Sequence, residues 1–176
     1  MPDVMQILGR TLSGRVVVAG VGCFGRRDDG CGPILARRLG DDSRLCALDC
    51  GDRPEDFTAD IARERPDTVV LADAVDLGAP PGSVAWLEDT DVPEGSPDTH
   101  RASLRVLMQY LRFRTGAEVV LLGIQPAVVS EGFELSPPVA ASVERLVSQF
   151  TSGEQAGEVA VEATRDPARE RSCTSR

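Results

Sequence analysis

Short apolar runs alternate with amphipathic segments along most of this chain, and the two kinds of segment predict different elements. The runs are rich in Val, Leu and Ile and are bounded by Gly, Pro and Asp, which is typical of buried parallel strands. They predict strands at residues 15–20, 44–49, 67–74, 83–88 and 117–124. Residues 83–88 alternate apolar and polar positions, so we expect this strand at an edge of the sheet.

The amphipathic segments carry apolar residues at helical spacing. Between residues 102 and 113 the apolar positions Leu104, Leu107, Met108 and Leu111 recur at i, i+3, i+4 and i+7. Segments of this kind predict helices from about Pro33 to Leu39 and at residues 54–65, 102–113 and 137–150. Alternating strands and helices indicate an α/β fold, a three-layer α/β/α sandwich with a mostly parallel central sheet of about five strands.

The same patterns divide the chain into one folded domain and two flanking segments. The domain covers residues 15–150, after an N-terminal extension of residues 1–14. Residues 151–176 lose the periodicity and mix small residues with charges of both signs. We therefore expect a disordered tail there.

Charge and composition exclude several classes of function. A formal net charge of −9 makes nucleic acid an unsuitable partner. All 19 basic residues are arginine, which removes Schiff-base lysines and the P-loop lysine. No apolar run reaches the roughly 18 residues that a membrane helix needs, and the first residues do not resemble a signal peptide. We therefore expect a cytoplasmic protein with no membrane insertion.

A glycine-rich stretch, GVGCFGRRDDG, follows the first predicted strand and permits two interpretations. Its G-x-G-x-x-G at residues 20–25, with Asp49 ending the second strand, matches the fingerprint of a dinucleotide-binding oxidoreductase. Asp28 and Asp29 count against that interpretation, because carboxylates at a helix N-terminus repel a pyrophosphate and compete for its donors.

The second interpretation is that the stretch presents carboxylates. Ligands of open α/β sheets gather at the carboxyl ends of the strands, where Asp29 and Asp73 are expected. His100, the single histidine, precedes the helix at 102–113. Two carboxylates and an imidazole suit a borderline divalent metal. Taken singly, each has an ordinary alternative: a helix cap, a strand-end turn residue and a surface histidine.

Five ordered blocks resemble a known family, the hydrogenase maturation endopeptidases. They are GVGCFGRRDDGCGP, LDCGDRPED, VVLADAVDLGAPPGSV, PDTHRASLRVLMQYL and VVLLGIQP, and they span about residues 15–150. LGIQP and the DTH stretch are most similar to the branch that serves formate-hydrogenlyase-type enzymes. The resemblance implies an α/β endopeptidase that removes the C-terminal extension of a NiFe-hydrogenase large-subunit precursor.

The resemblance also implies roles for individual residues. Asp29, Asp73 and His100 fall on the family's nickel-sensing and catalytic positions, with nickel supplied by the precursor and no permanent cofactor. The supporting loop consists of Gly20, Gly22, Cys23, Asp28 and Gly30. Two chemistries stay open: an acid acting as general base for water, or polarisation of the scissile carbonyl by the metal.

Three positions depart from the family pattern. Cys23 replaces an asparagine, Arg27 replaces the glycine before DDG, and Cys50 replaces the second glycine of DGG. Arg27 indicates that the loop either needs no positive φ there or follows a different path. The two cysteines are interpreted as a thiol pair for metal binding or redox control, or as small buried side chains. These changes keep open a non-catalytic relative that only binds the nickel-loaded precursor.

Overall fold

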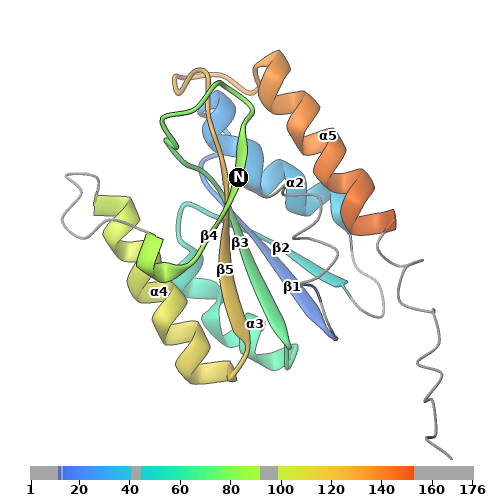
Figure 1. The fold of residues 1–176 in the computed structure, drawn as a ribbon, viewed down its shortest axis with the longest axis vertical. Helices are drawn as coiled ribbons and strands as arrows, with labels where there is room; N and C mark the ends of the chain where they lie inside the picture. The colour runs from blue at the N-terminus through green and yellow to red at the C-terminus, as the bar shows by residue number, and fades with distance from the viewer. Residues whose placement is uncertain (1–11, 13, 41–44, 92–98, 153–176) are drawn as a thin grey trace, which may run out of the picture.

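Strands and helices alternate along the computed structural model, which describes residues 12, 14–40, 45–91 and 99–152 (Figure 1). For Thr90 and residues 99–103 it describes the backbone alone. The elements are β1 (Val16–Val21), the 3-10 turn η1 (Arg27–Gly30), α2 (Cys31–Leu39), β2 (Leu45–Gly51), η2 (Pro54–Phe57), α3 (Thr58–Arg63), β3 (Thr68–Ala74), β4 (Val84–Leu87), η3 (Asp89–Asp91), α4 (Thr99–Thr115), β5 (Glu118–Ile124) and α5 (Pro137–Ser152). Residues 151 and 152, expected in the disordered tail, belong to α5, so the predicted start of the tail is wrong. The rest of the expected tail and most of the N-terminal extension lie outside the described residues.

The five strands form one sheet in the order β2-β1-β3-β5-β4. β1 pairs in parallel with both β2 and β3, and β3 pairs in parallel with β5. β4 is antiparallel to β5 and lies at the edge. The predicted, mostly parallel sheet and its edge strand are therefore confirmed.

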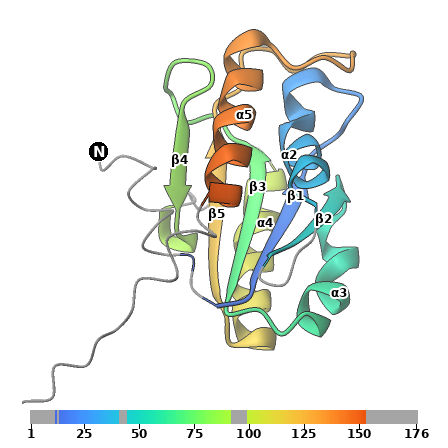
Figure 2. The ribbon, with the colours of Figure 1, turned by 90° about the vertical axis from the view of Figure 1, so that its right-hand side faces the viewer.

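Helices cover both faces of the sheet, as Figures 1 and 2 show from two sides. On one face, Val17 and Val69 pack in a buried cluster with residues of α3 and α4. On the other face, Val18 and Val70 pack with residues of α2 and α5. Because neighbouring residues of a strand point to opposite faces, continuous apolar runs supply both clusters. The three-layer sandwich follows from this double burial.

All four helices differ from their predicted bounds, α2 and α5 by two residues at one end and the other two by more. The helix expected at residues 54–65 is a 3-10 turn followed by a short α-helix that ends at Arg63. Arg65, with a φ of 50°, directly precedes Pro66, and a residue before proline is sterically disfavoured in the helical region. α4 begins at Thr99, earlier than predicted, so His100 belongs to its first turn.

The strand order creates a crevice at one end of the sheet. From β1 the chain passes to β2 on one side and then to β3 on the other. The connections therefore diverge between β1 and β3, and such a switch point leaves a crevice at the carboxyl ends of the two strands. The residues that follow β1 and those that end β3 consequently share one place in the fold.

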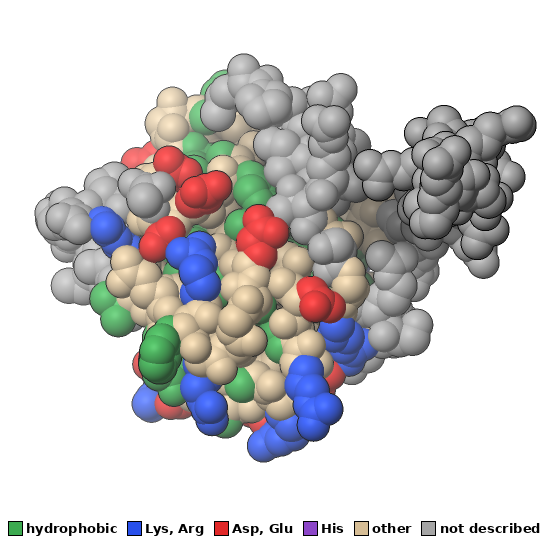
Figure 3. Space-filling view, turned by 60° about the horizontal axis from the view of Figure 1, so that its bottom comes forward, with side chains coloured by type: hydrophobic (Ala, Val, Ile, Leu, Met, Phe, Trp, Pro, Cys, Tyr) green, Lys and Arg blue, Asp and Glu red, His purple; other side chains and the backbone are tan. Residues whose placement is uncertain are grey.

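The opposite end of the molecule carries charges of both signs. On the face shown in Figure 3, arginine and acidic side chains are interspersed rather than separated into single-sign regions. Within the described part of the chain, no helix is both long enough and apolar enough to span a bilayer.

Candidate active site

Glycines bring the loop after β1 into close contact with the strand ends. A Cβ on Gly20 would collide with the carbonyl group of Gly32, and one on Gly32 would collide with the carbonyl oxygens of Ala72 and Val21. The N-terminus of α2 can therefore lie directly against β1 and β3 only because both positions lack side chains. These glycines serve backbone packing, which accounts for part of the G-x-G pattern without a phosphate.

The third close approach, at Gly22, brings two carboxylate residues together. A Cβ on Gly22 would collide with the carbonyl oxygen of Asp29 and would lie 3.6 Å from Oδ1 of Asp73. Gly22 has a φ of 127°, a conformation that favours glycine. The backbone carbonyl of Asp29 and the carboxylate of Asp73 therefore both lie beside Gly22 at the switch point, where the strand-end argument placed the two residues.

The Asp29 carboxylate is fixed at one oxygen. Its Oδ2 accepts a hydrogen bond of 3.0 Å from the amide of Cys23, and the side chain is half-buried. Among the described residues, none donates a hydrogen bond to Oδ1. Asp29 is thus oriented by the glycine loop and does not cap a helix.

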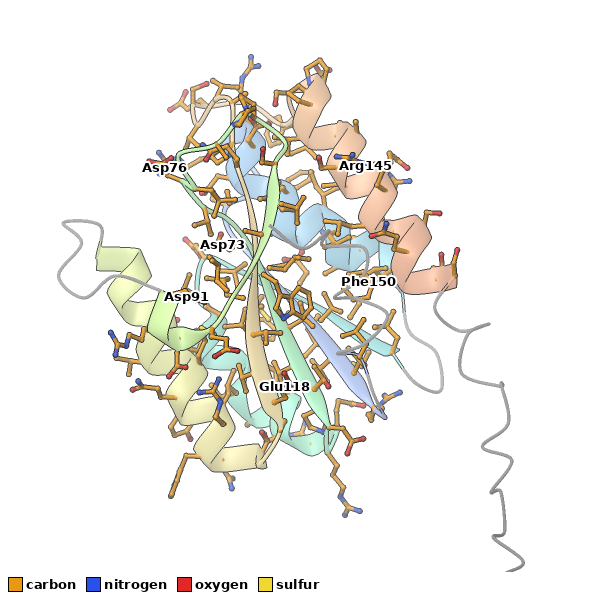
Figure 4. All side chains as sticks on the ribbon, in the orientation of Figure 1. Asp73, Asp76, Asp91, Glu118, Arg145 and Phe150 are labelled. Carbon is orange, nitrogen blue, oxygen red and sulfur yellow. The ribbon has the colours of Figure 1, made fainter. Side chains whose placement is uncertain are left out.

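Asp73 comes from the neighbouring strand. It is the penultimate residue of β3, and its Oδ1 accepts a hydrogen bond of 2.8 Å from the amide of Ala74. Figure 4 shows it toward the end of the sheet opposite Glu118, the residue at which β5 begins. The side chain is half-buried, which leaves part of the carboxylate accessible at the crevice.

A buried thiol lies among these acids. Burial, together with the negative charges of Asp73, Asp28 and Asp29, raises the pKa of Cys31 far above its ordinary value. The side chain of Cys31 is fully buried at the first position of α2. It therefore stays a neutral thiol at neutral pH, and thiolate nucleophilic catalysis is not available to it.

Asp28 joins the site loop to a segment about a hundred residues away. Its side chain is 0% exposed. Its carboxylate accepts hydrogen bonds from the amides of Ser136 (2.7 Å), Val128 (2.9 Å) and Ala127 (2.8 Å) and from the Ser136 hydroxyl (2.8 Å). Burial alone would raise the pKa of Asp28, but these hydrogen bonds outweigh it and lower the pKa below the ordinary 3.8. Asp28 is thus an ionised structural anchor directly before Asp29.

Backbone hydrogen bonds extend this connection. The amide of Arg27 donates to the carbonyl of Gly132 (2.8 Å), and the amide of Gly132 donates to the carbonyl of Gly25 (3.0 Å). Arg27 has a φ of 50°, so the expectation that the loop needs no positive φ there is wrong. The left-handed turn persists with an arginine because the surrounding hydrogen bonds fix it, at a conformational cost of about 1–2 kcal/mol.

The two cysteines of the proposed thiol pair differ in environment. Cys50 is buried, and burial, with a smaller contribution from the charge of Asp49, raises its pKa to about 12. Cys23 is half-buried, and both thiols are free. The burial of Cys50 agrees with the interpretation of a small buried side chain, and a role of the two thiols in metal binding or redox control stays a hypothesis.

His100 completes the predicted set only in part. Its backbone lies in the first turn of α4, while its side chain lies outside the description. In the described part of the chain, which omits that imidazole, no group of three or more His, Cys, Asp or Glu side chains could hold a metal ion. The structure therefore brings together Asp29 and Asp73 of the three predicted residues.

Sequence and structure comparisons identify the family. The family model for hydrogenase maturation proteases (HycI) matches residues 31–152. The chain belongs to this family. It is 29% identical over 160 residues to the hydrogenase 3 maturation protease of Escherichia coli K12, covering 89% of this chain and 94% of the relative.

Solved structures of family members share the fold. The crystal structure of the [NiFe] hydrogenase maturation protease HycI from Thermococcus kodakarensis superposes with a TM-score of 0.78 at 30% identity, covering 85% of this chain and 99% of that one. The hydrogenase maturating endopeptidase HybD from E. coli gives 0.65 at 26% identity, covering 81% and 94%. The family assignment identifies the chain as a peptidase of hydrogenase maturation and replaces the dinucleotide-binding interpretation.

One structural role in this family member was not predicted from the sequence. Asp28 was placed in the supporting loop, but its four hydrogen-bond donors on residues 127–136 were not anticipated. Three of those donors are backbone amides, which leave no side-chain signature in a sequence. The available signal was the polar Ser136 directly before the Pro137 that starts α5.

Proposed function

We propose that this protein is the endopeptidase that removes the C-terminal extension from the nickel-loaded precursor of a NiFe-hydrogenase large subunit. The observation that carries the proposal is the presence of two half-buried acids, Asp29 and Asp73, beside Gly22 at the switch point of a maturation-protease fold. Both acids lie where α/β sheets bind ligands, and both are partly accessible.

The nickel belongs to the substrate in this proposal. Asp29, Asp73 and His100 contact the metal that the precursor already carries, and oxygen and imidazole ligands suit a borderline divalent ion. Asp29 keeps one carboxylate oxygen for this contact, because the Cys23 amide binds the other. The protein thereby distinguishes a loaded precursor from an empty one by the free energy of metal contact.

In this proposal hydrolysis proceeds through water. Cys31, the thiol buried among the site acids, is protonated and does not act as a nucleophile. An acid of the site accepts a proton from the attacking water, which is general-base catalysis of the aspartic type. The substrate's nickel supplies Lewis-acid polarisation of the scissile carbonyl.

A cleavage assay with matched variants tests the proposal. Nickel-loaded and nickel-free large-subunit precursors of the same organism are incubated with wild type and with Asp29→Ala, Asp73→Ala or His100→Ala. Mass spectrometry reports loss of the C-terminal extension. Glu118→Ala is the control, because Glu118 is exposed at the other end of the sheet.

We expect wild type and Glu118→Ala to cut the loaded precursor only, and each site variant to lose at least a hundredfold in rate, an effect typical of removing one general base. Nickel-dependent binding without cutting would instead identify a non-catalytic relative. Equal cleavage of the nickel-loaded and the nickel-free precursor would refute the role of the three residues in recognising the metal.

A further inference from the structure

A hollow lies next to the acids, between the glycine loop and the loop before α5. Its volume is about 600 Å³, and its lining consists of Gly25, Arg26, Ser130, Glu131, Gly132 and Phe133. This volume falls within the range of binding pockets for small molecules and peptide segments.

The walls of this hollow are already in place. The backbone bonds between Arg27, Gly132 and Gly25 close one side of it. The Asp28 carboxylate also joins these two loops, through its hydrogen bonds to residues 127–136. A ligand that enters therefore does not have to order either loop, which reduces the entropic cost of binding.

The chemistry of the lining suits a peptide. Arg26 and Glu131 contribute one charge of each sign, and neither belongs to an ion pair among the described residues. The lining therefore has no formal net charge, which argues against phosphate or another polyanion. Ser130 and the glycine backbones offer hydrogen-bonding groups, as a peptide main chain requires.

An exposed aromatic ring adds the apolar component. Phe133 is 69% exposed, and its ring centroid lies 5.7 Å from that of Phe24. The guanidinium of Arg37 lies over the Phe24 ring, 4.5 Å from its centroid, and holds that ring in place. Solvent-exposed aromatic side chains next to a pocket are frequent anchor residues of protein–peptide interfaces.

The hollow is joined to the site through the chain, because one of its lining residues is hydrogen-bonded to Asp29 in the same turn. The carbonyl of Arg26, a lining residue, accepts the amide of Asp29 at 3.2 Å. We propose that this hollow binds the segment of the precursor next to the scissile bond, with an apolar side chain of that segment packed on Phe133. This inference rests on the proposed endopeptidase function, and it names the subsite that determines which peptide is cut.

Two variants test the subsite from opposite directions. Phe133→Ser removes the aromatic contact. Gly25→Leu fills the hollow, and the fold should tolerate it because a Cβ on Gly25 meets only the Phe133 ring, at 3.9 Å. The control is Phe113→Ser, since Phe113 is 89% exposed on α4, outside the hollow.

The first readout is steady-state cleavage of the loaded precursor. We expect KM to rise about tenfold for both variants, the loss of a typical anchor contact, with kcat within about twofold. Phe113→Ser should match wild type. An equal rise for Phe113→Ser, or unchanged KM for both hollow variants, would overturn the subsite while leaving the protease function intact.

The second readout does not depend on catalysis. A synthetic peptide that spans the scissile bond is titrated into the labelled full-length protein, and NMR follows the amides of Gly25 and Gly132. We expect both amides to shift in wild type, and the Gly132 amide not to shift in Gly25→Leu. If wild type cuts no precursor, the proposed function fails, and this titration alone decides the subsite: shifts support it and their absence refutes it.

Discussion

Replacing the buried carboxylate of Asp28 should destabilise the site loop more than any other single change of an acid in the described part of the chain. Asp28→Ala removes the acceptor of four hydrogen bonds and leaves three backbone amides and a hydroxyl without it. The side chain is fully buried, so the vacated donors are poorly placed to bond to water.

The expected loss follows from those bonds. A hydrogen bond to a charged group contributes about 1.5–3 kcal/mol, but the contributions are not additive, and burying the carboxylate has its own desolvation cost. We therefore expect the free energy of unfolding to fall by about 3–5 kcal/mol, the usual cost of removing one partner from a buried ionic network. For a chain of this size the melting temperature should fall by about 6–20 °C.

Urea unfolding followed by circular dichroism at pH 7 measures the effect, with Asp52→Asn as the control because Asp52 is exposed. The free energy of unfolding of Asp28→Asn should lie between those of wild type and Asp28→Ala, since one acceptor oxygen remains. The folded pKa of Asp28 is depressed, so its stabilisation is complete above the ordinary pKa of 3.8 and is lost as the pH falls through the lower folded value. Two results would refute this reasoning. One is a fall in the free energy of unfolding of Asp28→Ala under about 1 kcal/mol at pH 7. The other is a difference in unfolding free energy between wild type and Asp28→Asn that stays the same in acid.

Three further predictions concern the glycine loop, the thiols and one ion pair. Gly32→Ala should unfold at much lower urea concentration than wild type because its Cβ would collide with backbone carbonyls, whereas Gly25→Ala should stay within about 0.5 kcal/mol of wild type; equal midpoints would contradict the packing argument. Iodoacetamide at pH 7.5 should label Cys23 before the buried Cys31 and Cys50, as peptide mass spectrometry will show, and early labelling of Cys31 would contradict its burial. The hydrogen bond from Arg112 lowers the pKa of Asp89. Asp89→Asn should therefore lower the free energy of unfolding by about 0.5–1 kcal/mol at pH 7 and leave it unchanged once the pH is well below 3.8. Urea titration measures this difference, and a difference that persists in acid would exclude the ion pair as its cause.

The layers of the fold could be predicted from the sequence because a strand that is buried on both faces has a continuous apolar sequence. Continuous apolar runs such as residues 67–74 mark strands covered on both sides, and their order along the chain implied parallel pairing. The boundaries of helices were less predictable. The turn at Pro54 and the left-handed Arg65 divide and shorten a segment whose apolar spacing is continuous.

The site was predictable only as far as strand ends determine it. Asp29 and Asp73 could be placed together because both follow parallel strands. The contacts of residues 127–136 with the glycine loop could not be foreseen, since they join backbone atoms distant in sequence. The hollow at Phe133 was missed for the same reason, although a phenylalanine between Gly132 and Glu134 in a polar loop was its visible signal.

The anchor at Asp28 also bears on how the protein is made. Its partner Ser136 lies 108 residues later in the chain, so a ribosome must synthesise β2, β3, β4, α4 and β5 before the two can meet. Domains fold as their chains emerge, and a contact this distant forms among the last. A nascent chain that stops short of residue 136 therefore contains both acids but not the segment that holds their loop. The loop that carries Asp28 and Asp29 is therefore held in place only after residue 136 has been synthesised.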